Sequence, residues 1–272
     1  MFYVLLKLHN LWKLRYYHNT SFSLSERLSS SRLQVVSFGS FQDVVLKIDG
    51  LIILFDPFDR TEIKHQYFRY LDFNIIDSIH NFELDVVALS ACACSFSYSI
   101  VSKIVQKNRN VKWIIPLERK DWLIRQGVDE TSITVFGFWD EKTFNIQHRD
   151  ISVVCTPTHR NSVSSGSKMC NTCGWIVKGS TRTFYSAGFT NYNATNFSRV
   201  KERYGPIHLT LLPLSNTSGS MSCSPEFSVG IDEILDMHNI LQPCTSLGIV
   251  TTETRDYWYQ RSMVKVLERK HC

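Results

Sequence analysis

The sequence predicts a layered α/β sandwich, a class in which sheets and helices stack in layers. Strand-rich halves, each interleaved with helices, favour this class over a helical bundle or an all-β barrel. The run at 84–90 is apolar and β-branched, as is typical of a strand buried on both faces of a sheet. No repeat and no linker rich in Pro, Gly or Ser divides the 272 residues. We therefore expect one domain at 31–272, preceded by an N-terminal segment at 1–30.

The first half of that domain is organised by a hairpin and two helices. Asp49-Gly50 is among the strongest hairpin-turn dipeptides and separates two apolar runs. A helix is expected at 97–108, with Ile100 and Ile104 on its apolar face, and a shorter one at 118–126 that ends before Gly127. The strands expected here lie at 33–38, 43–48, 51–55, 84–90, 111–115 and 133–135.

The second half repeats the mixture of strands and helices. A strand at 151–155 runs into Thr156-Pro157, and the strands at 174–178 and 183–186 form a hairpin. Pro213 ends a strand at 207–212. The remaining expected elements are helices at 197–204, 231–241 and 255–268 and a strand at 246–250.

The charge of the chain is mildly positive and excludes little. Thirty Lys and Arg against 25 Asp and Glu give a net charge of +5, spread along the whole chain. No block of five or six like charges marks a nucleic-acid-binding arm, so nucleic acid is not an expected partner.

The N-terminal segment is apolar, aromatic and basic, with no acidic residue before Glu26. Lys7 and His9 interrupt its apolar run too early for a secretory signal, and the run is shorter than the ~20 apolar residues of a membrane span. Three interpretations stay open: an organelle presequence, a membrane-surface helix, and a helix packed on the domain. The expected location is intracellular, with membrane or mitochondrial association left open.

The eight cysteines are expected to be reduced. A chain of 272 residues can bury a sufficient core without disulfides, and a free thiol packs as a small apolar side chain. The cysteines are Cys92, Cys94, Cys155, Cys170, Cys173, Cys223, Cys244 and Cys272.

Several short motifs, in their order and spacing from about residue 33 to residue 252, resemble those of the metallo-β-lactamase superfamily. Within it they resemble the N-acyl-phosphatidylethanolamine phospholipase D family in particular. The motifs are SFGS at 37–40, LIILFDP at 51–57, LDVVALS at 84–90, IPL at 115–117, DW at 121–122, TPT at 156–158, GW at 174–175, FYSAG at 184–188, RYGP at 203–206 and LGI at 247–249. The resemblance implies a four-layer αββα sandwich. It also implies a site between the sheets where two zinc ions activate a hydroxide that hydrolyses phosphodiesters.

This sequence departs from the family at every zinc-ligand position that the resemblance assigns. Those positions hold Ala91, Ala93, Ser95, Phe96, Arg160, Phe189 and Val250. A catalytic zinc needs at least three protein ligands, and loss of one supporting partner alone costs about 10- to 100-fold in affinity or activity. We therefore expect no metal cofactor and a catalytically inactive relative that binds a phospholipid, a membrane surface or a protein.

An alternative interpretation is a rebuilt metal site. Cys92 and Cys94 form a C-x-C pair and Cys170 and Cys173 a C-x-x-C pair, and His159 stands beside a ligand position. The chain would then be a zinc-dependent, phospholipase D-type phosphodiester hydrolase acting on N-acylethanolamine phospholipids. Against this, residues 92 and 94 alternate with the ligand positions and should point away from the site.

Three further expectations concern contacts. Arg160, at the expected pocket mouth, is either an anion contact for phosphate or carboxylate or a solvated loop residue. Asp56, in the Asp-Pro motif, is expected to fix a loop, and His208 has no assigned role. Family members often form homodimers, so self-association or pairing with an active relative is expected alongside a membrane surface or phospholipid.

Overall fold

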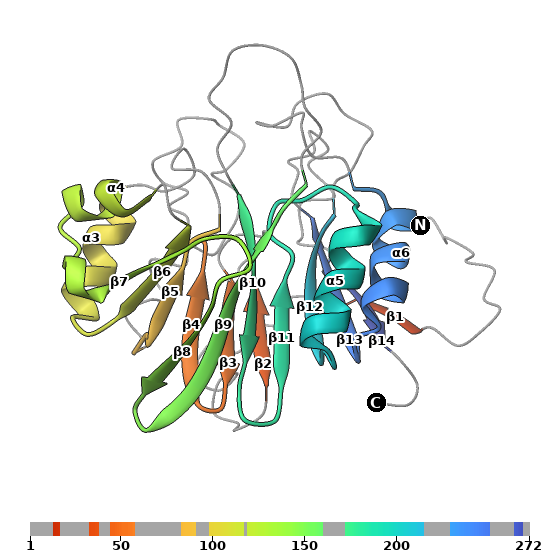
Figure 1. Ribbon diagram of the computed structural model, residues 1–272, viewed down its shortest axis with the longest axis horizontal. Helices are drawn as coiled ribbons and strands as arrows, with labels where there is room; N and C mark the ends of the chain where they lie inside the picture. Colours follow the sequence, from red (N-terminus) through yellow and green to blue (C-terminus); the bar gives the residue numbers. More distant parts are fainter. Residues whose placement is uncertain are drawn as a thin grey trace, which may run out of the picture.

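The protein is an αββα sandwich, as the sequence predicts. A computed structural model describes residues 13–16, 33–37, 44–57, 83–90, 98–116, 119–159, 172–214, 229–250 and 264–268. Two β-sheets pack face to face, and a pair of helices covers the outer face of each (Figure 1). The layered class is thus confirmed.

One sheet has six strands in the order β2-β3-β4-β5-β6-β7. Its hairpin turns at Asp49 and Gly50, whose φ angles of 50° and 81° are both positive, as a type I′ turn requires. From β4 to β7 the strands are parallel, so their carboxyl ends meet at one edge. The strands are β2 Gln34–Ser37, β3 Val44–Ile48, β4 Leu51–Phe55, β5 Val86–Ala88, β6 Lys112–Pro116 and β7 Ile133–Phe136.

The other sheet has eight strands in the order β1-β14-β13-β12-β11-β10-β9-β8. Strands β11, β12 and β13 are parallel to one another, and the remaining neighbours are antiparallel. The strands are β1 Lys13–Tyr16, β8 Glu141–Ile146, β9 Arg149–Pro157, β10 Cys173–Lys178, β11 Thr183–Ser186, β12 Leu209–Leu214, β13 Thr245–Val250 and β14 Val264–Glu268.

The helices lie close to their predicted positions. They are α3 Tyr98–Lys107, α4 Lys120–Arg125, α5 Ala194–Tyr204 and α6 Ile231–Leu241, with a short 3₁₀ helix, η5, at Glu130–Ser132. Gly127 follows α4 with a φ of +88°, which confirms it as the residue that stops this helix.

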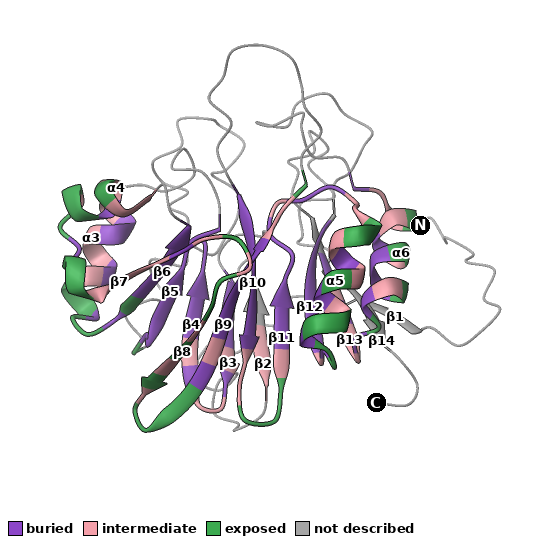
Figure 2. Cartoon of the chain, viewed as in Figure 1, coloured by how far each residue is buried: buried purple, intermediate pink, exposed green. Residues whose placement is uncertain are grey.

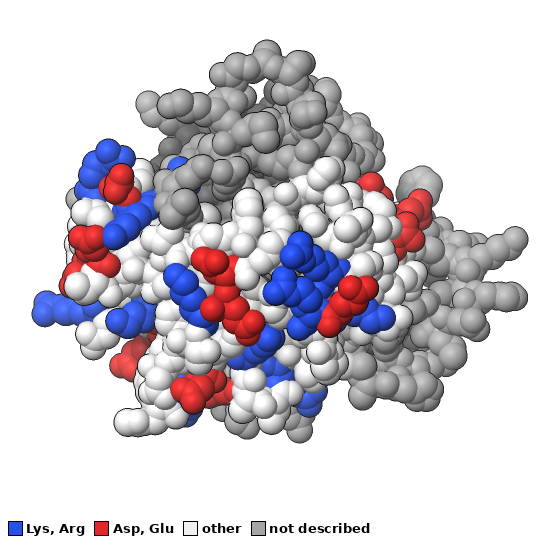
Figure 3. All heavy atoms as spheres, viewed as in Figure 1, with Lys and Arg blue, Asp and Glu red and all other residues white. Residues whose placement is uncertain are grey.

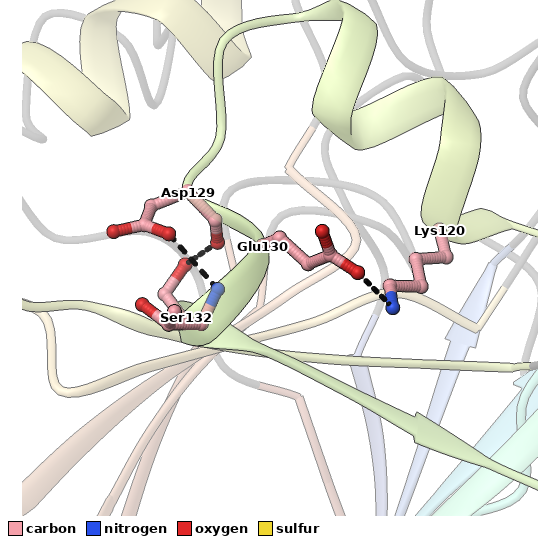
Figure 4. Close-up of polar contacts among 5 residues, drawn as sticks. Lys120, Asp129, Glu130 and Ser132 are labelled. Carbon is pink, nitrogen blue, oxygen red and sulfur yellow. Dashed lines mark hydrogen bonds and ion pairs between the residues drawn. The ribbon is translucent and has the colours of Figure 1, made fainter.

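A small polar network holds the segment between α4 and β7 (Figure 4). Asp129 caps η5, because its carboxylate accepts the Thr131 N–H at 2.9 Å and its carbonyl accepts the Ser132 hydroxyl at 2.7 Å. Glu130 forms an ion pair with Lys120 of α4. This exposed pair contributes little stability, so the cap is the main local constraint.

The core consists of three apolar layers. The layer between the sheets contains Phe55 against Phe184 at 5.4 Å between ring centroids and Phe136 edge-on to Trp175 at 5.3 Å. A second layer packs α3 and α4 on the six-stranded sheet, and a third packs α5 and α6 on the eight-stranded sheet. Figure 2 shows the central strands buried along most of their length and the helices exposed on their outer faces. This burial pattern explains why the central strands read as continuous apolar runs.

Two elements within residues 31–272 differ most from the sequence-based expectation. The prediction of a helix at 255–268 is wrong for its last five residues. Val264–Glu268 is strand β14, which pairs with β13 on one side and with β1 on the other. Residues 255–263 lie outside the described residues. Strand β8, Glu141–Ile146, was not expected at all.

The N-terminal segment is described only at Lys13–Tyr16. These four residues form strand β1, which pairs with β14, so at this point the segment is a strand of the domain's own sheet, which none of the three interpretations expected. The rest of 1–30 lies outside the described residues. In the part of the chain that the structure describes, no helix is both long and apolar enough to cross a membrane.

Cys244 corrects the expectation that every cysteine is reduced. It is disulfide-bonded, whereas Cys155 and Cys173 are free, buried thiols. Chain length indicates only that a disulfide is not required for folding. It does not prevent two thiols from meeting in space.

His208, which had no assigned role, joins the starts of two strands. Its ring Nδ1 accepts the Thr183 N–H at 3.0 Å, and its backbone N–H donates to the Thr183 carbonyl at 2.9 Å. Burial, and then the charge of Arg182, lowers the pKa of His208 below its ordinary 6.5. The neutral ring is therefore the form that the fold stabilises.

This contact predicts a pH-dependent stability. Because the folded pKa lies below the unfolded value, stability present above about pH 6.5 is lost as the pH falls through the folded pKa. His208→Asn retains an oxygen that can accept the Thr183 N–H but does not titrate. We expect its unfolding free energy in urea to fall less than that of the wild type between about pH 7.5 and about pH 5. Parallel pH profiles of the two proteins would contradict this prediction.

Candidate functional site

The candidate site is the edge at which the strands of both sheets end, which we call the strand-end edge. It comprises the residues after β4, β5, β9 and β11 and the start of β10, and the motifs LIILFDP, LDVVALS, TPT, GW and FYSAG meet there. Chemistry in layered α/β folds is usually placed at such strand ends. Its described side chains therefore decide what the site can do.

Asp56, directly after β4, anchors this edge. It is 2% exposed, and its carboxylate accepts the backbone N–H of Ser90 at 2.6 Å and also the Ser90 hydroxyl. Its own N–H donates to the Ala88 carbonyl at 2.9 Å. Ser90 follows β5, so the carboxylate fixes the backbone directly after this strand. This geometry supports the prediction that Asp56 has a structural role.

Hydrogen bonds continue from Ser90 across to the eight-stranded sheet. The Ser90 carbonyl accepts the Cys173 N–H at 2.9 Å, which links the two sheets at the strand-end edge. Beside it, the Thr158 hydroxyl donates to the Thr172 carbonyl at 2.8 Å, and the Thr172 hydroxyl donates to the Phe189 carbonyl at 3.3 Å. The polar groups of the edge therefore bond to one another.

Cys173 lies inside the core rather than on an open site. It is fully buried between the sheets and its thiol contacts that of Cys155 on β9. Burial, followed by the bond to Cys155 and the nearby charges, raises the pKa of Cys173 well above its ordinary value. Metal ligation requires the thiolate. In this fold Cys173 is thus held as the neutral thiol.

Phe189 lies where the resemblance expects an aspartate that bridges the two metal ions. The side chain is half-buried and packs against two apolar layers, the one between the sheets and the one beneath α3 and α4. Val250 is the last residue of β13. Both therefore occupy strand ends of the predicted site, and both side chains are apolar.

His159 is exposed and lies two residues after the end of β9. Its backbone is held in place, since its N–H donates to the Thr190 hydroxyl at 2.8 Å and its carbonyl accepts the Asn191 N–H at 2.8 Å. The other predicted site residues lie outside the described residues. These are Ala91, Cys92, Ala93, Cys94, Ser95, Phe96, Arg160 and Cys170.

The described residues at this edge provide no set of ligands for a pair of zinc ions. Zinc in proteins is bound by Cys, His, Asp or Glu side chains. At the ligand positions that the structure describes, the chain has Phe189 and Val250, and the ring of Phe189 packs on the core. Among the described residues as a whole, no three His, Cys, Asp or Glu side chains are grouped so that they could hold a metal ion.

A hollow lies at the opposite end of the parallel strands of the six-stranded sheet. It has a volume of about 110 Å³ and is lined by Val105, Asn108, Arg109, Val111, Trp113, Gly127, Val128, Asp129 and Ser132. These residues surround the end of α3 and the beginning of β6. The hollow is therefore separate from the strand-end edge.

Sequence reasoning did not find the Cys155–Cys173 contact or the Thr158–Thr172 pair. Both contacts depend on the antiparallel pairing of β9 with β10, which sets Cys173 opposite Pro157. The alternation of side chains along each strand could have placed both thiols on the inner face once that pairing was known. Spacing in the sequence alone does not supply it.

The architecture defines the class of protein. Two sheets between two pairs of helices, with the parallel strand ends at one edge, are the metallo-β-lactamase fold. A protein from Parabacteroides distasonis named as a metal-dependent hydrolase matches with a TM-score of 0.53 and 12% identity, over 86% of this chain and 86% of that one. The metallo-β-lactamase fold protein YhfI from Bacillus subtilis matches with a TM-score of 0.51 and 9% identity, over 78% and 83%. At these identities the likeness establishes the fold alone.

In sequence, the chain is similar to N-acyl-phosphatidylethanolamine-hydrolyzing phospholipase D 1 from Caenorhabditis elegans. The two are 24% identical over 184 residues, which are 66% of this chain and 48% of that protein. The chain thus matches about half the length of this curated relative. No family model matches the chain. The resemblance seen in the motifs is therefore confirmed as a distant similarity.

Proposed function

We propose that this chain is a catalytically inactive, metal-free counterpart of the metallo-β-lactamase-fold hydrolases and acts by binding a membrane phospholipid. The observation that carries the proposal is the position of Phe189. Its ring packs on two core layers at the strand-end edge, where the resemblance expects a carboxylate ligand. An apolar ring provides no lone pair for a metal ion, and it provides surface that favours an acyl chain over water.

Two further observations support a phospholipid as the ligand. The similar protein from Caenorhabditis elegans is named for hydrolysis of N-acyl-phosphatidylethanolamine, a membrane lipid. The N-terminal segment of this chain is basic and aromatic, a composition that favours anionic membrane surfaces. Binding without hydrolysis follows if the fold retains the lipid but lacks the metal-activated nucleophile.

The decisive experiment is the zinc content of the purified, reduced, tag-free full chain, measured by elemental analysis. We expect well under one zinc ion per chain in a protein whose circular dichroism shows it to be folded, and no release of phosphatidic acid from N-acyl-phosphatidylethanolamine. The Caenorhabditis elegans relative, prepared in the same way, is the positive control. One or two tightly held zinc ions would overturn the proposal and favour the rebuilt site with Cys92, Cys94, Cys170, Cys173 or His159.

Lipid binding is tested separately by sedimentation with vesicles. The full chain should sediment with phosphatidylcholine vesicles that contain N-acyl-phosphatidylethanolamine, and less with phosphatidylcholine alone. Phe189→Asp, which places a charge on the apolar ring's position, should reduce this binding about tenfold. Equal binding by both proteins would remove Phe189 from the proposed lipid site.

A further inference from the structure

A group of cationic and aromatic side chains lies on the outer side of the eight-stranded sheet. It forms where α5 meets the turn between β7 and β8, whereas the strand-end edge lies between the sheets. We call it the cation–aromatic cluster, and it consists of Trp139, Lys178, Arg199, Arg203 and Tyr204. Figure 3 shows Lys and Arg side chains gathered on the face that carries α5, with acidic side chains beside them.

The two rings form the base of the cluster. Trp139 and Tyr204 are stacked with 6.4 Å between ring centroids and 5° between ring planes. The Arg199 guanidinium carbon lies 4.4 Å from the Trp139 ring centroid, and the Arg203 guanidinium carbon lies 5.7 Å from the same centroid. The Lys178 ammonium nitrogen lies 4.8 Å from the Tyr204 centroid. Three cations are thus held together over two rings.

Two of these cations make no hydrogen bond or ion pair with a carboxylate among the described residues, although Arg203 lies near enough to Glu141 to interact with its charge. Lys178 pairs with Glu141 at 2.9 Å, and the same Glu141 oxygen accepts the Ser152 hydroxyl at 2.7 Å. Arg199 and Arg203 are both exposed, and the structure gives them aromatic contacts but no hydrogen bond or ion pair within the described chain. Their spacing of four residues places like charges on one face of α5, which opposes helix formation.

The cluster also contains a hydroxyl without a partner. Tyr204 is 4% exposed, yet its hydroxyl has no hydrogen-bond partner in the part of the chain that is described. A buried hydroxyl that lacks a partner has a free-energy cost, and two like charges four residues apart on a helix repel each other. An oxyanion would relieve the repulsion between the guanidiniums.

The geometry points to a phosphate group as the ligand: we propose that the cation–aromatic cluster binds phosphate through Arg199 and Arg203. A guanidinium stacked on a ring keeps its N–H edge free, in a planar fork that matches two oxygens of a phosphate. Two such forks one helical turn apart can share one phosphate group. The phosphate comes either from the headgroup of an anionic phospholipid or from a soluble phosphate compound, since both present the same oxygens.

The test uses the full chain and inorganic phosphate at low ionic strength. Binding is followed by the NMR shift of the Trp139 indole N–H, which is present in all the arginine variants. This signal is assigned as the one that disappears from the spectrum of Trp139→Phe. The double variant Arg199→Gln/Arg203→Gln should bind at least about tenfold more weakly. The matched control, Arg109→Gln/Arg125→Gln, removes the same charge from exposed residues near α3 and α4 and should bind within about twofold of wild type.

A second variant separates charge from geometry. Arg199→Lys/Arg203→Lys keeps both charges but loses the planar forks, so its affinity should fall between those of the wild type and the double Gln variant. Equal affinities of the Lys variant and the wild type would overturn the bidentate role. Equal losses in the double Gln variant and its control would overturn the proposal as a whole.

Vesicles identify the source of the phosphate. The vesicles consist of phosphatidylcholine with about 30% phosphatidic acid. A lipid headgroup is supported if the wild type and the control sediment with them and Arg199→Gln/Arg203→Gln sediments less. Binding of inorganic phosphate without such sedimentation supports a soluble compound. The proposal is overturned if neither is bound, or if only a single-stranded oligonucleotide is bound. Zinc content and hydrolysis are independent of these results.

Discussion

Gly188→Ala is expected to destabilise the protein by about 4 kcal/mol or more. Gly188 follows β11 with a φ of +68°, in the left-handed region that residues with a Cβ rarely adopt. A Cβ added there would lie 2.2 Å from the Cys173 carbonyl oxygen. That oxygen belongs to the backbone of β10, so the clash cannot be relieved by moving a side chain. The measurement is the free energy of unfolding in guanidinium chloride.

Two other glycines separate the causes of that loss. Gly127 also has a positive φ, +88°, but a Cβ there meets nothing within 4 Å, so Gly127→Ala should cost only about 1–2 kcal/mol. Gly230 has neither a positive φ nor a neighbour within 4 Å, and Gly230→Ala should cost about 1 kcal/mol or less. If Gly188→Ala lowers the free energy of unfolding no more than Gly127→Ala does, the close approach of β10 is not the reason why this position needs glycine.

Asp56→Ala is expected to cost about 3 kcal/mol of unfolding free energy. It removes the acceptor of the Ser90 N–H and hydroxyl, and it leaves these buried donors unpaired. It also places alanine at a φ of +47°, where aspartate is tolerated better. Hydrogen exchange at the Ser90 amide should accelerate together with the loss of stability, because the strand-end edge opens where the bond is missing.

Asp56→Asn is the matched control for this prediction. Its side-chain oxygen can still accept the Ser90 N–H, its amide can donate to the Ser90 oxygen, and asparagine tolerates a positive φ. The expected cost is about 1 kcal/mol. If Asn destabilises as much as Ala, the negative charge matters more than the hydrogen bonds, and the anchoring role assigned to Asp56 is wrong.

Much of the fold could be predicted where local sequence is sufficient. The turn at Asp49-Gly50 needs two positive φ angles, and few dipeptides tolerate them as well, so the hairpin is readable from two residues. Helix α6 occupies the bounds expected for it, because its apolar period is uninterrupted between Gly230 and Gln242. In both cases the deciding interactions lie within a few residues of one another.

The errors occur where the partner of a segment is far away in sequence. Strand β8 has only Phe144 and Ile146 as apolar side chains, and its pairing with β9 decides its conformation. The chain at Val264–Glu268 is a strand because β13 and β1 flank it. Its alternating valines fit a strand, but the helical pattern expected over 255–268 did not anticipate those neighbours. In both segments, pairing with strands distant in the sequence decides the conformation.

The functional residues, too, could be predicted from the sequence only in part. The identity of Phe189 at a ligand position is readable from the motif order, but its packing on two core layers is not. Trp139 lies about 60 residues from Arg199 and Arg203 in the sequence, so no local pattern predicts that they meet. The side chains that carry the phosphate proposal therefore emerge only from the fold.

The link between β7 and β8 has a consequence for association. Each of these strands is the outermost of its sheet, and a row of unpaired backbone groups normally invites an extended segment of another molecule. Here the chain reverses from one sheet into the other, and the Lys142 ammonium donates to the Val135 carbonyl at 2.6 Å, which occupies one acceptor of β7. The exposed positions of β8 are Glu141, Thr143 and Asn145, all polar. This flank of the sandwich is thereby protected against strand-to-strand aggregation.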